Sequence, residues 1–139
     1  MNTKFTAIIA TTVDTPNRNG IIYSKAAMEE AIKKMQPIID EGRLMGELGQ
    51  GSSAVNLGNV SHKIDKLWIE DGKGYGDITI LNTPQGKIVE DLLNIEPTPV
   101  SLGMRCIGTP EYSTEDPKIG VVKDLSIITM DIIQNEQRN

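Results

Sequence analysis

The pattern of apolar and polar residues predicts a strand, a loop and one main helix in the N-terminal third of the chain. Residues Lys4–Val13 are rich in Ile, Thr and Ala, and a dense set of turn formers follows at Asp14–Gly20. Ser24 suits a helix N-cap, and apolar residues then recur at helical spacing toward Gly42, with Pro37 as a point where the helix could bend. These recurring positions are Met28, Ala31, Ile32, Met35 and Ile39.

The middle of the chain predicts a short strand and then a β-hairpin. Leu44–Leu48 is short and apolar, and it leads into the polar loop Gly49–Ser53. Val60–Ile69 has the period of an extended strand, and turn residues at Asp71–Gly74 separate it from a second run, Tyr75–Leu81. Period two places one set of its residues on the same side of the strand, namely Val60, His62, Ile64 and Trp68.

A second helix is predicted after the hairpin. Thr83 suits an N-cap and Pro84 the first helical position, and the helix is expected to end near Asn94. Its expected buried stripe consists of Ile88, Val89, Leu92 and Leu93.

The last third of the chain predicts further strands. Val100–Ile107 is one strand, Thr109–Gly120 is a connecting loop, and Val121–Ile133 has enough β-branched residues for one long or two short strands. Residues 134–139 form a polar tail. We therefore expect residues 1–139 to form a single α+β domain, a small, mostly antiparallel and closed or half-closed β-barrel with two flanking helices.

Composition and charge limit the classes of partner that we expect this chain to bind. Aromatic residues are only 4% of the chain, so the core must be aliphatic. The net charge of -5 argues against binding to nucleic acid, and no stretch is long and apolar enough to span a membrane. A single cysteine, Cys106, allows neither an internal disulfide nor a zinc site, so we expect a reducing compartment, no metal and no cofactor.

Two polar residues are candidates for chemistry. His62 is the only imidazole and the only side chain whose ordinary pKa suits a general base near neutral pH, yet its place on the apolar side of a strand favours a structural role. Ser101 precedes Gly103 and Arg105, which could together form an oxyanion site, although serine is an ordinary residue in strands. Cys106 is interpreted as a buried structural thiol.

Several segments, taken in order, resemble the tailed-phage prohead proteases. These head maturation serine endopeptidases share their fold with the herpesvirus assemblin proteases, and the resemblance extends from about residue 5 to residue 133. The segments that carry it are Asn17–Tyr23, Leu44–Leu48, Val60–Ile64, Leu67–Trp68, Tyr75–Gly76, Thr83–Lys87 and Val100–Arg105.

The resemblance implies a site with one member replaced. In that family Ser101 would be the nucleophile, and the general base is a histidine in a Gly-Glu-Leu-x-His-Pro motif. The corresponding segment here is Gly46-Glu-Leu-Gly-Gln-Gly51, so Gln50 stands at the histidine position and Gly51 at the proline position. A glutamine amide cannot take the proton of a serine hydroxyl, which leaves Ser101 as a vestigial nucleophile and His62 as the one possible base.

Three functions follow from this resemblance. The first is an auxiliary or decoration protein of the phage head, an inactive protease fold that binds the major capsid protein or other head proteins and possibly itself. The second is an active head maturation endopeptidase that cleaves scaffold and capsid proteins. The third is an internal scaffold or cargo protein. Each predicts a virion protein assembled in the bacterial cytoplasm.

Overall fold

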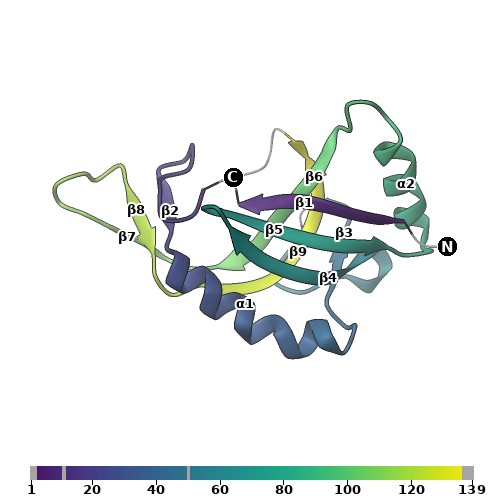
Figure 1. Cartoon of the computed structure of the whole chain (residues 1–139), viewed down its shortest axis with the longest axis horizontal. Helices are drawn as coiled ribbons and strands as arrows, with labels where there is room; N and C mark the ends of the chain where they lie inside the picture. The colour runs from purple at the N-terminus through teal and green to yellow at the C-terminus, as the bar shows by residue number, and fades with distance from the viewer. Residues whose placement is uncertain (1–2, 11, 50, 136–139) are drawn as a thin grey trace.

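The computed structural model describes residues 3–10, 12–49 and 51–135, and it has an α+β architecture with mostly antiparallel sheets. The largest sheet has four strands in the order β1-β5-β4-β3 and is antiparallel throughout (Figure 1). Its strands are β1 (Lys4–Ala10), β5 (Lys73–Ile80), β4 (Val60–Glu70) and β3 (Met45–Glu47). The predicted strands in these regions are thereby confirmed.

A second sheet carries the C-terminal strand. In it β6 (Val100–Ile107) pairs antiparallel with β9 (Ser126–Gln134) along its whole length. A single parallel bridge between Leu48 and Ile132 joins β9 to the segment just after β3.

The third sheet corrects the predicted loop 109–120. This segment contains β7 (Pro110–Tyr112), which pairs antiparallel with β8 (Gly120–Val122), and β8 in turn pairs parallel with β2 (Ile21–Tyr23). Strands of three residues are too short to show a hydrophobic period, so the sequence pattern missed β7.

Of the two forms of barrel that the sequence left open, the closed one is wrong, because the described strands do not form a closed barrel. The four-stranded sheet and the β6–β9 pair lie against each other through β1 with β6 and β3 with β9. Between β3 and β9 only the bridge at Leu48 is present, and no ladder joins β1 to β6 in the described part of the chain. The strands therefore enclose one core without closing into a cylinder.

The two helices begin where their caps predict. Helix α1 (Lys25–Asp40) starts after Ser24, whose Oγ accepts a hydrogen bond from the Ala27 N–H, and it runs through Pro37. Helix α2 (Pro84–Leu93) starts after Thr83, which caps the Gly86 N–H in the same way. Its expected stripe is corrected at Ile88, which is 48% exposed, while Val89 is fully buried.

The hairpin β4–β5 turns at Asp71 and Gly72, which both have positive φ, as a type I′ hairpin turn requires. One detail of the predicted strand is wrong. The register of β4 shifts between Ile64 and Lys66, so Leu67 rather than Trp68 points into the core beyond this bulge. Trp68 instead stacks on Tyr75 with ring centroids 5.5 Å apart.

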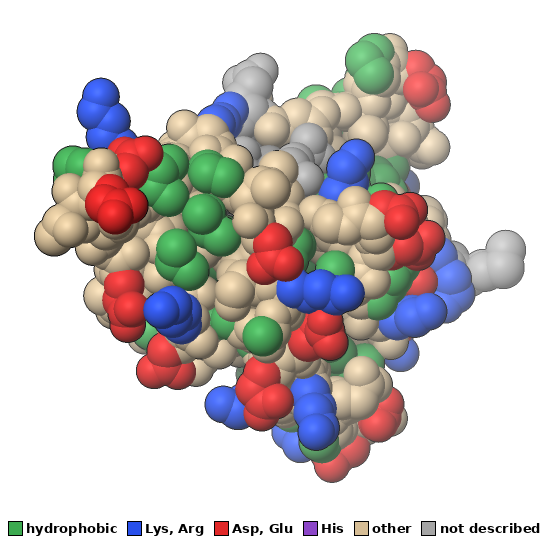
Figure 2. All heavy atoms as spheres, turned by 60° about the vertical axis from the view of Figure 1, so that its left-hand side comes forward, with side chains coloured by type: hydrophobic (Ala, Val, Ile, Leu, Met, Phe, Trp, Pro, Cys, Tyr) green, Lys and Arg blue, Asp and Glu red, His purple; other side chains and the backbone are tan. Residues whose placement is uncertain are grey.

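The core between the sheets and α1 is aliphatic, as the composition predicts. Its fully buried members include Ile9, Met28, Ile64, Ile78, Ile80, Leu102, Met130 and Ile132. Figure 2 turns the β7–β8 end of the molecule forward and shows hydrophobic side chains gathered there, with acidic and basic side chains around them. Among the described residues, no helix is long and apolar enough to cross a membrane.

Candidate functional site

Strand β6 places Ser101, Gly103 and Arg105 on one side of the β6–β9 sheet, since alternate residues of a strand face the same way. Across the ladder, Gly103 is paired with Asp131 of β9. All three residues are buried. The site is therefore an interior one, and its chemistry depends on which polar groups reach it.

Ser101 makes no hydrogen bond to a base among the described residues. Its side chain is almost completely buried, and its Oγ donates a hydrogen bond to the carbonyl oxygen of Leu102 at 3.3 Å. A serine hydroxyl needs a base within hydrogen-bond reach to become a nucleophile. In this geometry Ser101 is a satisfied polar residue of the strand.

His62 uses both ring nitrogens elsewhere. The side chain is fully buried on β4, with Nε2 2.7 Å from the carbonyl oxygen of Met130 and Nδ1 2.7 Å from Oγ of Ser61. A carbonyl can only accept, so Nε2 carries the proton, and the neutral ring accepts from Ser61 at Nδ1. Burial lowers the pKa of His62, although the Met130 bond and nearby Asp131 oppose this, so the ring is neutral. His62 is thus buried and hydrogen-bonded, and its lowered pKa agrees with the neutral ring that the sequence led us to expect.

The His62–Met130 bond explains the glycine at position 46. Gly46 lies opposite His62 in the β3–β4 ladder, and a Cβ added there would collide with Nε2 of His62 and with the Met130 carbonyl oxygen. Only a residue without a side chain lets β3, β4 and β9 approach this closely. The glycine of the Gly46-Glu47-Leu48 segment therefore serves the packing of His62.

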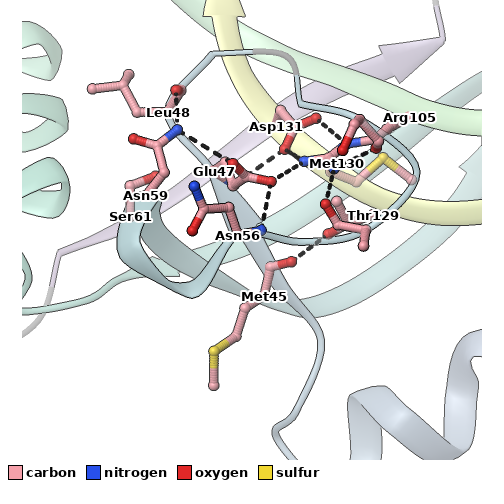
Figure 3. Close-up of polar contacts among 12 residues, drawn as sticks. Met45, Glu47, Leu48, Asn56, Asn59, Ser61, Arg105, Thr129, Met130 and Asp131 are labelled. Atoms are coloured by element: carbon pink, nitrogen blue, oxygen red, sulfur yellow. Dashed lines mark hydrogen bonds and ion pairs between the residues drawn. The ribbon is translucent and has the colours of Figure 1, made fainter.

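Arg105 lies at the centre of a buried ion network (Figure 3). Its Nε and Nη2 donate to the two oxygens of Asp131 at 2.8 and 2.6 Å, and Nη2 also donates to Oε2 of Glu47 at 2.8 Å. Its Nη1 donates to the carbonyl oxygens of Ser52 at 2.8 Å and Ala54 at 3.2 Å. A guanidinium has five N–H donors, and this arrangement uses them all. No N–H of Arg105 is left to bind an oxyanion.

The hydrogen bonds of this network stabilise the charged forms of Glu47 and Arg105. Burial disfavours the ionised Glu47 carboxylate, but bonds from Arg105, Asn56 and Asn59 outweigh it and lower the pKa of Glu47. The bonds to Asp131 raise the pKa of Arg105, more than offsetting burial. At neutral pH Glu47 is thus ionised beside the buried Arg105 cation, whose other acidic neighbour is Asp131.

The network also holds the loop that follows β3. Besides the two carbonyls held by Arg105, Glu47 Oε2 accepts from the Asn56 N–H at 3.1 Å, and Asn59 Nδ2 donates to the Leu48 carbonyl at 2.8 Å. A Cβ added at Gly51 would lie 2.7 Å from Glu47 Oε2 and 2.9 Å from Arg105 Nη1. The space beside Gly51 is therefore occupied by the network, which explains why this chain has glycine at the position where the resemblance implies proline.

Gln50, at the position of the expected histidine, lies outside the described residues. Its neighbour Gly49 donates its N–H to the carbonyl oxygen of Ile132 at 2.7 Å, and the next residue of β9, Ile133, is paired with Ser101. The backbone of Gly49 therefore lies against β9, and β9 separates it from Ser101 on β6.

Cys106 lies half-buried at a cavity of about 310 Å³, which it lines together with Tyr23, Arg105 and Val122. Burial raises the pKa of the Cys106 thiol, although a hydrogen bond with Tyr23 opposes this. Burial and the thiol together raise the pKa of Tyr23 to about 12. Cys106 is therefore a weakly acidic, neutral thiol at neutral pH.

The sequence reasoning singled out Arg105 but missed its partners Glu47 and Asp131. A signal was present for Asp131, which is a lone acidic residue within an apolar run of a predicted strand. A charge in such a position needs an opposite charge close by. Among residues 3–10, 12–49 and 51–135, no group of histidine, cysteine and acidic side chains could hold a metal ion.

Comparison with known proteins links the chain to one kind of fold. No protein-family model matches it, and no curated protein matches it in sequence. Among solved structures, the capsid assembly protease gp21 of bacteriophage T4 is similar, with a TM-score of 0.79 and 17% sequence identity over 95% of this chain and 82% of that one. The chain therefore has a fold like that of a phage capsid assembly protease.

Proposed function

We propose that this chain is a phage head protein that uses a prohead-protease fold for binding rather than for catalysis. It would act as an auxiliary or decoration protein, with the major capsid protein or other head proteins as partners and the virion as its location. The observation that carries the proposal is the hydrogen bonding of the site. Ser101 Oγ donates to its neighbour's carbonyl, and both nitrogens of His62 are engaged by Ser61 and Met130.

The chemical reason is the absence of a proton acceptor at Ser101 in the described part of the chain. His62 is neutral, but its Nδ1 lone pair already accepts from Ser61, and its Nε2–H donates to Met130. To serve as the base, His62 would have to break both buried bonds. Its position is also tightly packed, because it lies opposite Gly46 in the β3–β4 ladder, where any side chain at position 46 would collide with the ring. Removing the base of a serine nucleophile lowers the rate by several orders of magnitude.

The fold likeness to a capsid assembly protease favours a second candidate, an active head maturation endopeptidase. A fluorophosphonate probe separates the two, since it labels only an activated serine. We expect no adduct on Ser101 of the wild-type chain, with Ser101→Ala as the matched negative control. An adduct that maps to Ser101 by mass spectrometry would refute the inactive site.

The binding role has its own test. Purified chain is mixed with mature heads of the phage that encodes it and sedimented. Saturable co-sedimentation of both wild type and Ser101→Ala supports an auxiliary protein. Antibody access to the chain on intact heads then separates an outer decoration protein from internal scaffold or cargo. No binding, together with failed scaffold processing in a phage carrying Ser101→Ala, would refute the proposal.

A further inference from the structure

Half of strand β4 has no neighbouring strand on one edge. Its other edge pairs with β5 along most of its length. On the open edge, β3 pairs only with Val60 to Lys63, and the Leu44 carbonyl accepts from the Ile64 N–H. Among the described residues, no strand and no further backbone hydrogen bond reaches residues 65–70 on this edge. An exposed strand edge is a template for pairing with another chain.

The backbone groups of Leu67 and Ile69 point toward this open edge. Successive residues of a strand direct their N–H and C=O groups to opposite edges. Glu70 and Lys73 flank the two-residue turn, so they are the hydrogen-bonded pair that closes the hairpin, and the register is regular back to Lys66. Leu67 and Ile69 therefore direct their backbone groups away from β5, to the edge that β3 does not cover.

Helix α1 runs beside this edge without pairing with it. Figure 1 shows α1 lying along β4, and the two elements pack together. A groove of about 420 Å³ lies between them, lined by Trp68 and Ile69 from β4 and by Lys25, Glu29, Ile32 and Lys33 from α1. A helix satisfies its own backbone, so α1 cannot bond to the edge in place of a strand.

The sequence of this edge is complementary to itself. It reads Lys66-Leu67-Trp68-Ile69-Glu70, with opposite charges at its ends and apolar residues between them. When two copies pair antiparallel with Trp68 opposite Trp68, each Leu67 lies opposite Ile69 of the other copy, and each Lys66 lies opposite Glu70. The register that matches the outward backbone groups is thus also the register that pairs opposite charges.

The side chains of this edge are already ordered in the single chain. Trp68 stacks on Tyr75 of β5, Lys66 lies 4.8 Å from the centroid of the Trp68 ring, and the Trp68 Nε1–H donates to Glu70. In the self-paired register the two Trp68 residues form a non-hydrogen-bonded pair, the kind in which opposite side chains lie closest. Aromatic pairs across strands stabilise a sheet.

The charges around the edge balance one another. Those of the groove and of residues 65–70 are Lys25, Lys33 and Lys66 against Glu29, Asp65 and Glu70. The surface is therefore locally neutral although the whole chain has a net charge of -5, and at physiological salt charges farther away than about 8 Å are largely screened. A neutral surface selects neither an acidic nor a basic partner, whereas the self-complementary sequence selects a second copy.

We propose that two copies of this chain associate through the open edge of β4, in antiparallel pairing centred on Trp68. The backbones of Leu67 in each copy and Ile69 in the other bond to each other, and Lys66 of each copy meets Glu70 of the other. The two four-stranded sheets thereby become one continuous sheet across a two-fold axis. The proposal concerns a different surface from Ser101 and is independent of whether that site is active.

The first test measures association and locates it. The pairing covers few residues, so the dimer should be weak, and sedimentation velocity is followed up to about 1 mM chain. We expect a reversible monomer–dimer equilibrium, with a change in fluorescence of Trp68, the only tryptophan, over the same range of concentration. Hydrogen exchange of the Leu67 and Ile69 amides should slow as the dimer forms, whereas the amide of Trp68, which faces β5, should not change.

Charge exchange tests the register. Lys66→Glu and Glu70→Lys each place like charges opposite one another at both ends of the pairing, so each should weaken the dimer on the order of tenfold. The two substitutions combined in one chain restore opposite charges and should restore the dimer. An equimolar mixture of the two single variants should likewise form a heterodimer.

Lys87→Glu is the matched control. It changes the net charge as Lys66→Glu does, but it lies on α2 outside this surface, so it should leave the dimer unchanged. Lys66, Glu70 and Lys87 are all exposed, so the variants should fold, as circular dichroism would verify.

Three outcomes would overturn the proposal. The first is a chain that stays monomeric at the highest concentration. The second is a dimer in which the Leu67 and Ile69 amides exchange as fast as in the monomer, which would place the contact on another surface. The third is a dimer that both single variants leave as tight as in the wild type, or that the combined exchange of Lys66 and Glu70 does not restore.

Discussion

Replacing Arg105 by methionine is the sharpest test of the buried ion network. Methionine fills a similar volume but removes all five donated bonds. The side chains of Glu47 and Asp131, 4% and 0% exposed, are then left without their cation. Removing one partner of a buried ion pair typically costs 3–5 kcal/mol, because the remaining charge is uncompensated. We expect Arg105→Met to lose about 3–5 kcal/mol, a large part of an ordinary domain's stability of roughly 5–15 kcal/mol.

The loss should depend on pH in a defined direction. In the wild type the pKa of Glu47 is lowered, so its contribution is present above the unfolded pKa and is lost as pH falls through the folded pKa. Without Arg105, the bonds from Asn56 and Asn59 are all that oppose burial, so the pKa of Glu47 rises and its carboxyl binds a proton more readily when folded. The difference in unfolding free energy between wild type and Arg105→Met should therefore shrink from pH 7 to pH 5.

Urea unfolding, followed by Trp68 fluorescence and far-ultraviolet circular dichroism, measures both effects. Arg43→Met is the matched control, since Arg43 is 63% exposed and pairs with Glu41 on the surface. It should change stability by less than about 1 kcal/mol. The reasoning fails if Arg105→Met costs no more than this control at pH 7, or if its penalty grows as pH falls.

Three further predictions concern the residues around Ser101. His62→Ala should destabilise by about 1–3 kcal/mol, because Ser61 and Met130 lose their partner. Since the folded pKa of His62 is lowered, wild type should lose stability as pH falls below about 6.5, and a variant with the same pH profile would contradict this. Gly46→Ala should destabilise the chain more than the control Gly42→Ala in thermal melts, because the methyl added at position 46 collides with His62 and Met130. At Gly42 nothing lies within 4 Å, so the control suffers only the strain of alanine at positive φ. Gln50→His should give weak fluorophosphonate labelling of Ser101, and labelling of this variant equal to wild type would show that the site needs more than a base. Adding Gly51→Pro to this variant should lower its Tm, because the proline would crowd Glu47 and Arg105.

Local signals in the sequence predicted most elements of the fold. Ser24 and Thr83 cap the two helices, and Asp71 with Gly72 turns the hairpin, because these features depend on a few adjacent residues. The predictions failed where partners are distant in sequence. The pairing of β2 with β8 and the open arrangement in place of a closed barrel depend on which edges meet in space.

The site shows the same division. The sequence located Ser101 and Arg105 on one strand and predicted a buried, neutral His62, because period two and burial follow from the local pattern. It did not assign Glu47 to Arg105, from which it is separated by 58 positions. The buried network became visible only when β3, β6 and β9 were placed together.

The sequence by itself determined the helices, the hairpin, the aliphatic core and the candidates for chemistry, since hydrophobic period, caps and residue types are local properties. Only the tertiary structure decided what those candidates do. A hydroxyl, an imidazole and a guanidinium can each be catalytic or structural, and the outcome depends on which donor or acceptor each one meets. Here Ser101 meets a carbonyl, His62 meets Ser61 and Met130, and Arg105 meets two carboxylates, all through contacts that the fold creates.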